Sequence, residues 1–126
     1  MIIVSKRIGA RFYVNNNSQP ASNPIPGTVV DHTITREGRY DFYLVSQSTR
    51  HGTITPTYYN VIFDESGLRP DKMQMIAYKM CLNYFNWTGG VRVPAPCQYA
   101  HKLAFQTGEN THSIPHTSLA NKLHYL

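Results

Sequence analysis

The sequence predicts a mixed α/β fold in which a mixed sheet forms first and two main helices follow. The first half of the chain alternates turn residues with short runs rich in Val, Ile, Thr, Tyr and Phe, which favour strands. The second half carries apolar residues at helical spacing, with proline and glycine at the helix limits. At 126 residues, the chain is expected to form one domain at most.

Several short segments are predicted to be strands, each bounded by turn residues. They are residues 2–4, 11–14, 27–35, 40–46 and 57–63. A polar loop is expected at residues 15–26, which contain four Asn, two Ser and three Pro. Residues 36–39 (Arg-Glu-Gly-Arg) have the length of a hairpin connection, and residues 64–67 (Asp-Glu-Ser-Gly) form a turn after the last strand.

The first helix is predicted from an apolar stripe that follows Pro70 and Asp71, a pair that favours a helix start. Apolar or aromatic side chains recur at i, i+3, i+4, i+7, i+8 and i+11, at Met73, Ile76, Ala77, Met80, Cys81 and Tyr84. Gly89 and Gly90 lie past the end of this pattern. The stripe is expected to pack against the sheet as part of the core.

The second helix is predicted over residues 94–107, because Pro94 and Pro96 fix φ and lack N–H groups. One face of this helix would carry Cys97, Ala100, His101 and Ala104. Gln98 would lie one turn before His101, and Lys102 would lie beside His101. Two interpretations stay open. The segment is either an ordinary amphipathic helix whose histidine has a structural role, or a functional cluster of polar side chains at the start of a helix.

The C-terminal region is expected to end in a helical turn at residues 118–126. His112 and His116 have an H-x3-H spacing, but Pro115 interrupts a helix there, so a zinc pair is not expected. Leucines recur at i, i+4 and i+7, at Leu119, Leu123 and Leu126. The tail can therefore dock one apolar face.

The charge balance favours a polyanionic partner such as nucleic acid. Twelve Lys and Arg against seven Asp and Glu give a net charge of +5. Cys81 and Cys97 could form one bridge, but reduced thiols in an intracellular protein are the simpler interpretation. The apolar run at residues 2–4 is too short for a signal sequence or a membrane span, so no membrane partner is expected.

Several blocks of the sequence carry a family resemblance. They are PGTVVD (26–31), YDFYLVSQS (40–48), GTITPTYYNV (52–61), YKMC (78–81), YFNW (84–87) and RVPAPCQYAHKLAF (92–105). In this order, the blocks resemble the C-terminal part of the PIWI domain of Argonaute proteins, and the Tyr-Leu ending resembles that of the Piwi clade. The resemblance implies a ribonuclease-H-like fold. Residues 1–126 are expected to be a partial PIWI domain, with its first strands and the other Argonaute domains upstream of Met1.

The resemblance further implies a role in small-RNA (piRNA)-guided RNA silencing, in which active members cut a target RNA paired to a guide RNA. Cleavage in the family uses three acidic residues and a histidine or aspartate around two Mg²⁺ ions. His101 matches the histidine of this set, and the acidic members are expected upstream of Met1. The chain alone is therefore expected to be inactive, and whether the full protein is an endoribonuclease stays open.

The acidic residues inside the chain are not expected to replace the missing ligands. Asp64 and Glu65 form an adjacent pair, but their turn needs such residues for ordinary turn chemistry. Asp31 and Asp41 are interpreted as turn or strand-end residues.

The resemblance also implies that the chain lines the guide RNA channel. The basic residues that match contacts to the guide backbone are Lys6, Arg7 and Arg11, and the other channel positions are Gln47, Tyr84, Arg92 and Gln98. Contacts of this kind neutralise and position phosphates without reading bases. Taken singly, each Lys or Arg also fits an ordinary solvated surface charge.

The 5′-phosphate of the guide is expected to depend on a metal ion. Gln106 stands where many relatives outside the Piwi clade have an arginine for this phosphate. The Piwi-like ending implies that the C-terminal carboxylate of Leu126 helps to hold the ion, and a carboxylate suits Mg²⁺. A frayed terminus without a ligand role is the alternative interpretation.

Three functional hypotheses follow: part of a guide-directed RNA-cleaving protein, a slicing-inactive guide-binding scaffold, or an independent small RNA-binding protein. The last requires the chain to fold alone, which the apolar first strand argues against. The expected partners are a small guide RNA and its complementary target RNA, and the oligomeric state is left open. The expected location is the cytoplasm, including ribonucleoprotein granules, with the nucleus as the alternative.

Overall fold

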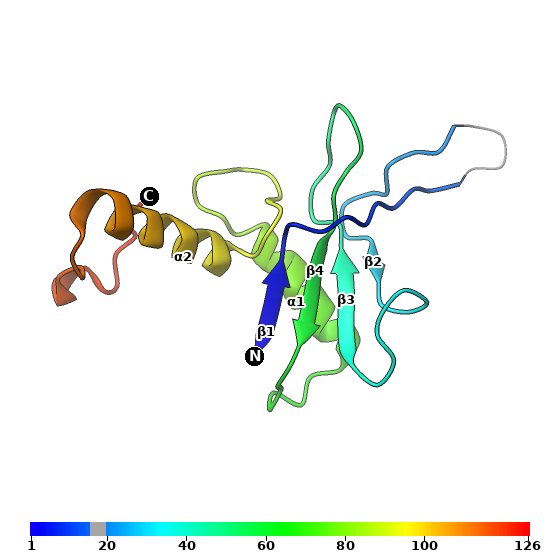
Figure 1. The fold of residues 1–126 in the computed structure, drawn as a ribbon, viewed down its shortest axis with the longest axis horizontal. Helices are drawn as coiled ribbons and strands as arrows, with labels where there is room; N and C mark the ends of the chain where they lie inside the picture. The colour runs from blue at the N-terminus through cyan, green and yellow to red at the C-terminus, as the bar shows by residue number, and fades with distance from the viewer. Residues whose placement is uncertain (16–19) are drawn as a thin grey trace.

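The computed structural model describes residues 1–15 and 20–126, and its strands form one four-stranded sheet (Figure 1). Residues 16–19 of the predicted polar loop lie outside the described residues. Every pairing between the described strands is antiparallel. In spatial order the strands are β1 (Ile2–Ser5), β4 (Thr57–Val61), β3 (Tyr40–Leu44) and β2 (Val29–Val30).

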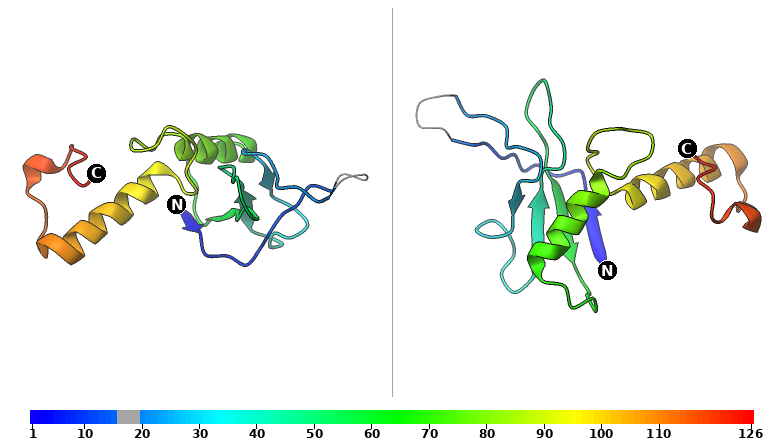
Figure 2. Two further views of the ribbon diagram at one scale, coloured as in Figure 1. Left: turned by 90° about the horizontal axis from the view of Figure 1, so that it is seen from above. Right: turned by 180° about the vertical axis from the view of Figure 1, so that it is seen from behind.

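One face of the sheet is covered by α1 (Pro70–Cys81), and the core lies between them (Figure 2). The helix begins with Pro70 in its first turn, as predicted. Phe42 and Tyr59 face each other across β3 and β4, and their rings stack with centroids 4.8 Å apart. The buried cluster consists of Phe42, Leu44, Tyr59, Ala77 and Cys81. The predicted order of a sheet followed by two helices is thus confirmed, while the described strands form an antiparallel rather than a mixed sheet.

The buried side of α1 is narrower than the predicted stripe. Met73, Ala77 and Cys81 are buried at four-residue intervals. The prediction is wrong for Met80, which is 40 % exposed. The sheet lies against the face of α1 on which residues recur every four positions. The side chain of Tyr78 packs against the core, and that of Met80 does not.

Two predicted strands are corrected by the structure. Residues 11–14 form no strand, and only an isolated bridge at Val14 remains. The ring of Phe12 instead packs edge-on against Tyr43, with centroids 5.4 Å apart, so this segment lies against the sheet face opposite α1. The strand predicted at residues 27–35 is reduced to β2.

The shortness of β2 has a backbone cause. Gly27 has a φ of 93° and Thr33 has a φ of 68°. Both values lie in the left-handed region, which is incompatible with extended strand backbone. The extended stretch therefore ends on either side of Val29 and Val30.

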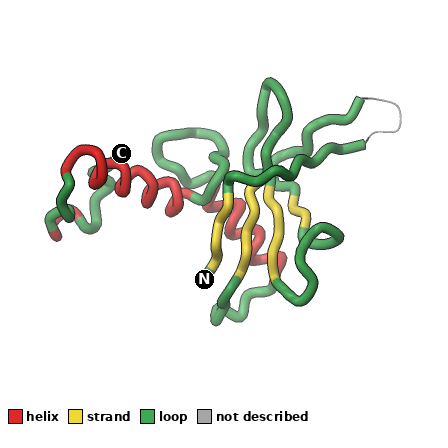
Figure 3. The backbone as a smooth tube through the Cα atoms, in the orientation of Figure 1, coloured by secondary structure: helices red, strands yellow, loops and turns green. Residues whose placement is uncertain are grey.

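The second helix, α2 (Ala95–Phe105), projects away from the sheet (Figure 3). Ala95 is its one buried residue, and the predicted face of Cys97, Ala100, His101 and Ala104 is exposed. The helix continues as a π-helical turn, Gln106–Thr111, in place of the predicted end at residue 107. A short 3₁₀ turn, Thr117–Leu119, partly confirms the closing helical turn. No helix among the described residues is long and apolar enough to cross a membrane.

Candidate nucleic-acid interface

Hydrogen bonds around Arg92 join the end of β1 to the start of α2. The Arg92 guanidinium donates to the backbone carbonyl of Lys6. The Arg92 carbonyl accepts hydrogen bonds from Thr57 Oγ1 at 2.7 Å and from Ser46 Oγ at 3.2 Å. Arg92 therefore fixes the start of the segment that carries Lys6, Arg7 and Arg11 relative to the entry into α2.

Cations gather at this junction, and we refer to Lys6, Arg7, Arg11 and Arg92 as the basic cluster. The first three are exposed, and none of the four forms an ion pair within residues 1–15 and 20–126. Burial, and then the positive charge of Arg11, lowers the pKa of Arg92. Its Nε atom is buried without a hydrogen-bond partner among the described residues. A bound anion would offset the repulsion between the charges of Arg92 and Arg11.

His101 is exposed on α2 and lines two cavities. The smaller one, of about 200 Å³, is also lined by Lys6 and Gln98. The larger one, of about 400 Å³, is lined by Gln98, Lys102 and Leu126. The structure therefore brings together predicted site residues from α2, from the chain end and from the segment that follows β1, with His101 and Gln98 common to both cavities.

The residues near His101 do not by themselves fit a two-Mg²⁺ cleavage site. Among the described residues, no group of three His, Cys, Asp or Glu side chains could hold a metal ion. Such a site needs several oxygen ligands around the ions. The acidic ligands of any such site would have to come from other sequence.

Three of the acidic residues make hydrogen bonds away from His101. Hydrogen bonds from Ser66 lower the pKa of Asp64 within its exposed turn. Asp41 is buried and accepts a hydrogen bond of 2.5 Å from Tyr58 Oη. Asp31 accepts a hydrogen bond of 2.9 Å from Gln74 Nε2, the main cause of its lowered pKa. These contacts are those of turn and structural carboxylates.

The larger of the two His101 cavities extends to the chain end, where it offers ligands for a single hard cation. Gln106, Asn110 and Leu126 line it together. The Gln106 Oε1 atom is buried and has no hydrogen-bond partner within the described part of the chain. Mg²⁺ prefers carboxylate and amide oxygens, and an orphaned buried oxygen in native structures calls for a partner. The residues present therefore fit a Mg²⁺ ion at this end of the molecule.

Gln47 and Tyr84 lie in a third cavity, a groove of about 1030 Å³ that Lys102 also lines. The Tyr84 ring is buried and packs against Tyr99, with centroids 5.6 Å apart. Tyr99 in turn lies 6.2 Å from the ring of Tyr125. Tyr84 thus lines the groove and also links the end of α1 to the C-terminal tail through a row of aromatic rings.

Sequence reasoning missed three side chains of this surface. Lys102 lines both the groove and the cavity at Leu126, a role that its place beside His101 did not predict. Arg50 and Trp87 line the groove from two separate loops. A tryptophan directly before Thr-Gly-Gly, in a segment that follows the end of a helix, is the signal that could have found Trp87.

Comparisons with known proteins place this geometry in a family. The sequence model of the Piwi domain matches residues 1–112. Piwi-like protein 1 of Danio rerio is 53 % identical over 126 residues, which are 100 % of this chain and 15 % of that protein. The crystal structure of Drosophila Piwi superposes with a TM-score of 0.88 and 54 % identity, over 99 % of this chain and 17 % of that one.

A more distant solved structure is also similar. The crystal structure of Kluyveromyces polysporus Argonaute with a guide RNA has a TM-score of 0.74 and 32 % identity. It covers 84 % of this chain and 13 % of the Argonaute chain. The present chain thus spans a small part of the length of each protein that it matches.

Proposed function

Because the chain belongs to the Piwi domain family, we propose that it lines the channel in which a small-RNA (piRNA)-guided silencing protein holds its guide RNA and the complementary target RNA. The observation that carries the proposal is the basic cluster, whose four cations have no acidic partner within the described residues. The similar Argonaute that was crystallised with a guide RNA supports RNA as the partner.

The chemistry of this surface suits binding that is independent of sequence. Lysine and arginine neutralise phosphates and release counterions, whatever the bases are. Gln47, Gln98 and the hydroxyl of Tyr84 add uncharged donors along the cavities. A guide of any sequence can therefore follow the same backbone path.

His101 is the proposed contribution of this chain to target cleavage. When bound, Mg²⁺ ions supply activation of water and stabilisation of the leaving oxygen. The exposed imidazole shares its cavities with Lys6, Gln98 and Lys102, which are donors suited to a phosphate. The same cations would serve a slicing-inactive scaffold. The residues of this chain do not separate these two functions, because the acidic ligands that would distinguish them are expected in other parts of the full-length protein.

Leu126 is proposed to act at the 5′ end of the guide. Leu126 and Gln106 line one cavity, and the Gln106 Oε1 atom is buried without a partner among the described residues. The C-terminal carboxylate and this amide oxygen would hold Mg²⁺. A cation there offsets the repulsion between the carboxylate and a terminal phosphate.

The proposal is tested by measuring guide RNA binding to a full-length Piwi protein whose matching segment has the sequence of residues 1–126. We call this protein the full-length carrier. Lys6, Arg7 and Arg11 are changed to Ala together. We expect guide affinity to fall about equally for unrelated sequences. The slope of log affinity against log salt should decrease by roughly one unit per lost phosphate contact.

A matched control removes the same amount of charge elsewhere. Arg69, Lys72 and Lys79 lie on or before α1, outside the cavities described above, and are also changed to Ala. This control variant should bind guides with the unchanged salt slope. A loss confined to some guide sequences, or equal slopes for the two triple variants, would reject backbone contact by the basic cluster.

A further inference from the structure

The groove of about 1030 Å³ lies between two loops that are fixed to each other. One wall is formed by residues 46–50, which follow β3, and the other by residues 86–91, which join α1 to α2. A Cβ atom on Gly90 would lie 2.5 Å from the Ser46 carbonyl oxygen, so the two backbones are in close contact. Ser46 Oγ also donates to the Val91 carbonyl at 2.7 Å. The two walls are therefore joined where Ser46 meets Gly90 and Val91.

Trp87 presents an exposed indole on this rigid wall. It is 62 % exposed, and its backbone N–H donates to the Tyr84 carbonyl at 3.2 Å, which closes a turn. The indole Nε1 would lie 3.0 Å from a Cβ on Gly89, so the ring edge rests against the glycine backbone. Within residues 1–15 and 20–126, no aromatic ring is paired with Trp87. The large aromatic face is available to a ligand.

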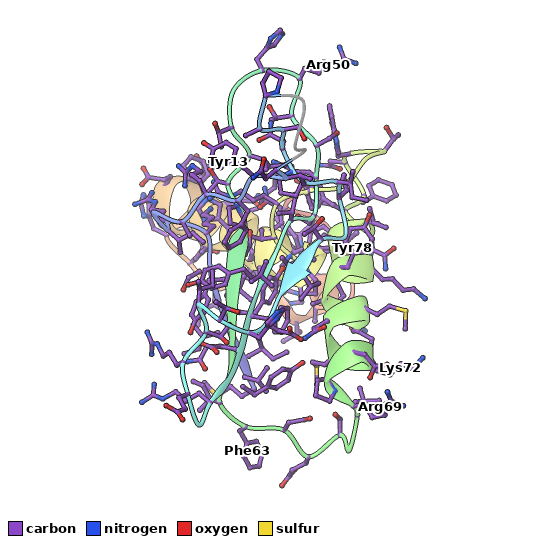
Figure 4. All side chains as sticks on the ribbon, turned by 90° about the vertical axis from the view of Figure 1, so that its right-hand side faces the viewer. Tyr13, Arg50, Phe63, Arg69, Lys72 and Tyr78 are labelled. Atoms are coloured by element: carbon purple, nitrogen blue, oxygen red, sulfur yellow. The ribbon has the colours of Figure 1, made fainter. Side chains whose placement is uncertain are left out.

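The groove around Trp87 is positively charged. Arg50 lies at the outer end of the loop after β3 (Figure 4), and Lys102 lines the groove from α2. Gln47, Ser48 and Thr49 supply polar side chains, and no Asp or Glu is among the lining residues that the structure describes. Cations with an exposed aromatic ring and no carboxylates are the combination that binds single-stranded nucleic acid, since bases stack while cations contact phosphates.

We propose that Trp87 stacks on one base of the RNA strand in this groove, at a nucleotide that is unpaired when it binds. This inference rests on the proposed function, because it requires RNA to follow the channel past Gln47 and Tyr84. It adds a contact of a different chemistry from the basic cluster. The stacking is tolerant of base identity but requires that a base be present.

The test uses guide RNAs with a single abasic site placed at each position in turn, bound to the full-length carrier. In the unchanged protein, one position should lose about tenfold in affinity when its base is removed. The Trp87→Ala variant should bind intact RNA about tenfold more weakly than the unchanged protein does. Removing the same base should cause no further loss of affinity in this variant. Trp87→Phe should keep most of the position dependence. Because stacking displaces no counterions, the salt slope should stay unchanged in Trp87→Ala.

Phe85 provides a control for Trp87. Phe85 is 79 % exposed on the same loop but does not line the groove, so Phe85→Ala should bind RNA normally. If Trp87→Ala leaves RNA affinity unchanged, or weakens all abasic guides equally, the stacking proposal is overturned, and a protein partner becomes the better occupant. If the triple variant of Lys6, Arg7 and Arg11 also leaves affinity unchanged, the proposed function itself fails.

Discussion

The guanidinium of Arg92 donates a hydrogen bond to the backbone carbonyl of Lys6, across 86 positions of sequence. This contact connects the end of β1 with the entry into α2, so the helix that carries His101 and the segment that carries Lys6 are positioned together. Arg92 was expected only as a channel residue. The structure shows that it also holds the backbone at Lys6, where the segment that carries Arg7 and Arg11 begins.

Changing Arg92 to Ala should therefore weaken both the fold and RNA binding. The Lys6 carbonyl loses a charged donor, which should cost about 1–3 kcal/mol of stability. Arg92→Lys keeps the charge but lacks the planar fork of the guanidinium. It should restore the salt slope of guide binding more fully than it restores stability. Pulse proteolysis in urea measures stability in the full-length carrier, and equal behaviour of the Lys and Ala variants in both assays would contradict the two roles.

Gly90 should tolerate no side chain. A methyl group there would meet the Ser46 carbonyl oxygen at 2.5 Å, and the obstacle is backbone rather than a flexible side chain. We expect Gly90→Ala to destabilise the full-length carrier by about 1–3 kcal/mol, as overpacking does. Gly9→Ala is the matched control, because nothing lies within 4 Å of a Cβ at Gly9. A similar urea midpoint for the two variants would show that the loops can separate without cost.

His101 should be needed for cleavage and not for guide loading. In a full-length carrier that cleaves, His101→Ala should lower the single-turnover cleavage rate by about 100-fold or more. The guide dissociation constant should change by no more than about twofold, because His101 is exposed and supports no buried packing. His112→Ala, at an exposed position outside both His101 cavities, is the control. A parallel loss of loading would make His101 a structural residue.

The isolated chain should not cleave RNA with Mg²⁺ or Mn²⁺. Residues 1–15 and 20–126 contain no side-chain cluster that could hold the two ions. The measurement is incubation of the 126-residue chain with a guide and its paired target, followed by gel analysis. Cleavage at one defined phosphodiester would show that the chain carries its own acidic ligands.

Much of the fold follows from local patterns in the sequence. β3 and β4 were predicted from runs rich in Val, Ile, Thr, Tyr and Phe, to which the buried pair of Phe42 and Tyr59 belongs. α1 was predicted from apolar residues that recur on one face. The false strand at residues 11–14 has the right composition, but Phe12 is used against Tyr43 on the sheet face. Which residues Phe12 contacts is a tertiary property that strand propensity does not contain.

The identity of the residues in the candidate site was predictable from the sequence, but their arrangement in space was not. Family motifs indicate His101, Gln98 and Lys6, and the structure places all three at one cavity. That meeting depends on the Arg92 contact across the chain, which no local spacing encodes. The groove position of Trp87 depends likewise on the close approach of Gly90 to Ser46.

At the chain end, Leu126 and Gln106 line one cavity, and the Gln106 Oε1 atom is buried without a partner among the described residues. Adding one residue after Leu126 moves the carboxylate and should weaken binding of 5′-phosphorylated guides by about 10-fold to 100-fold, the usual cost of disturbing a metal site. Guides with a 5′-hydroxyl should be affected much less. Leu126→Met keeps the carboxylate in place and serves as the control. Chelation of divalent ions should remove the advantage of the phosphorylated guide in the unextended protein. Equal losses for both guides, or none, would leave Leu126 as an ordinary packing residue.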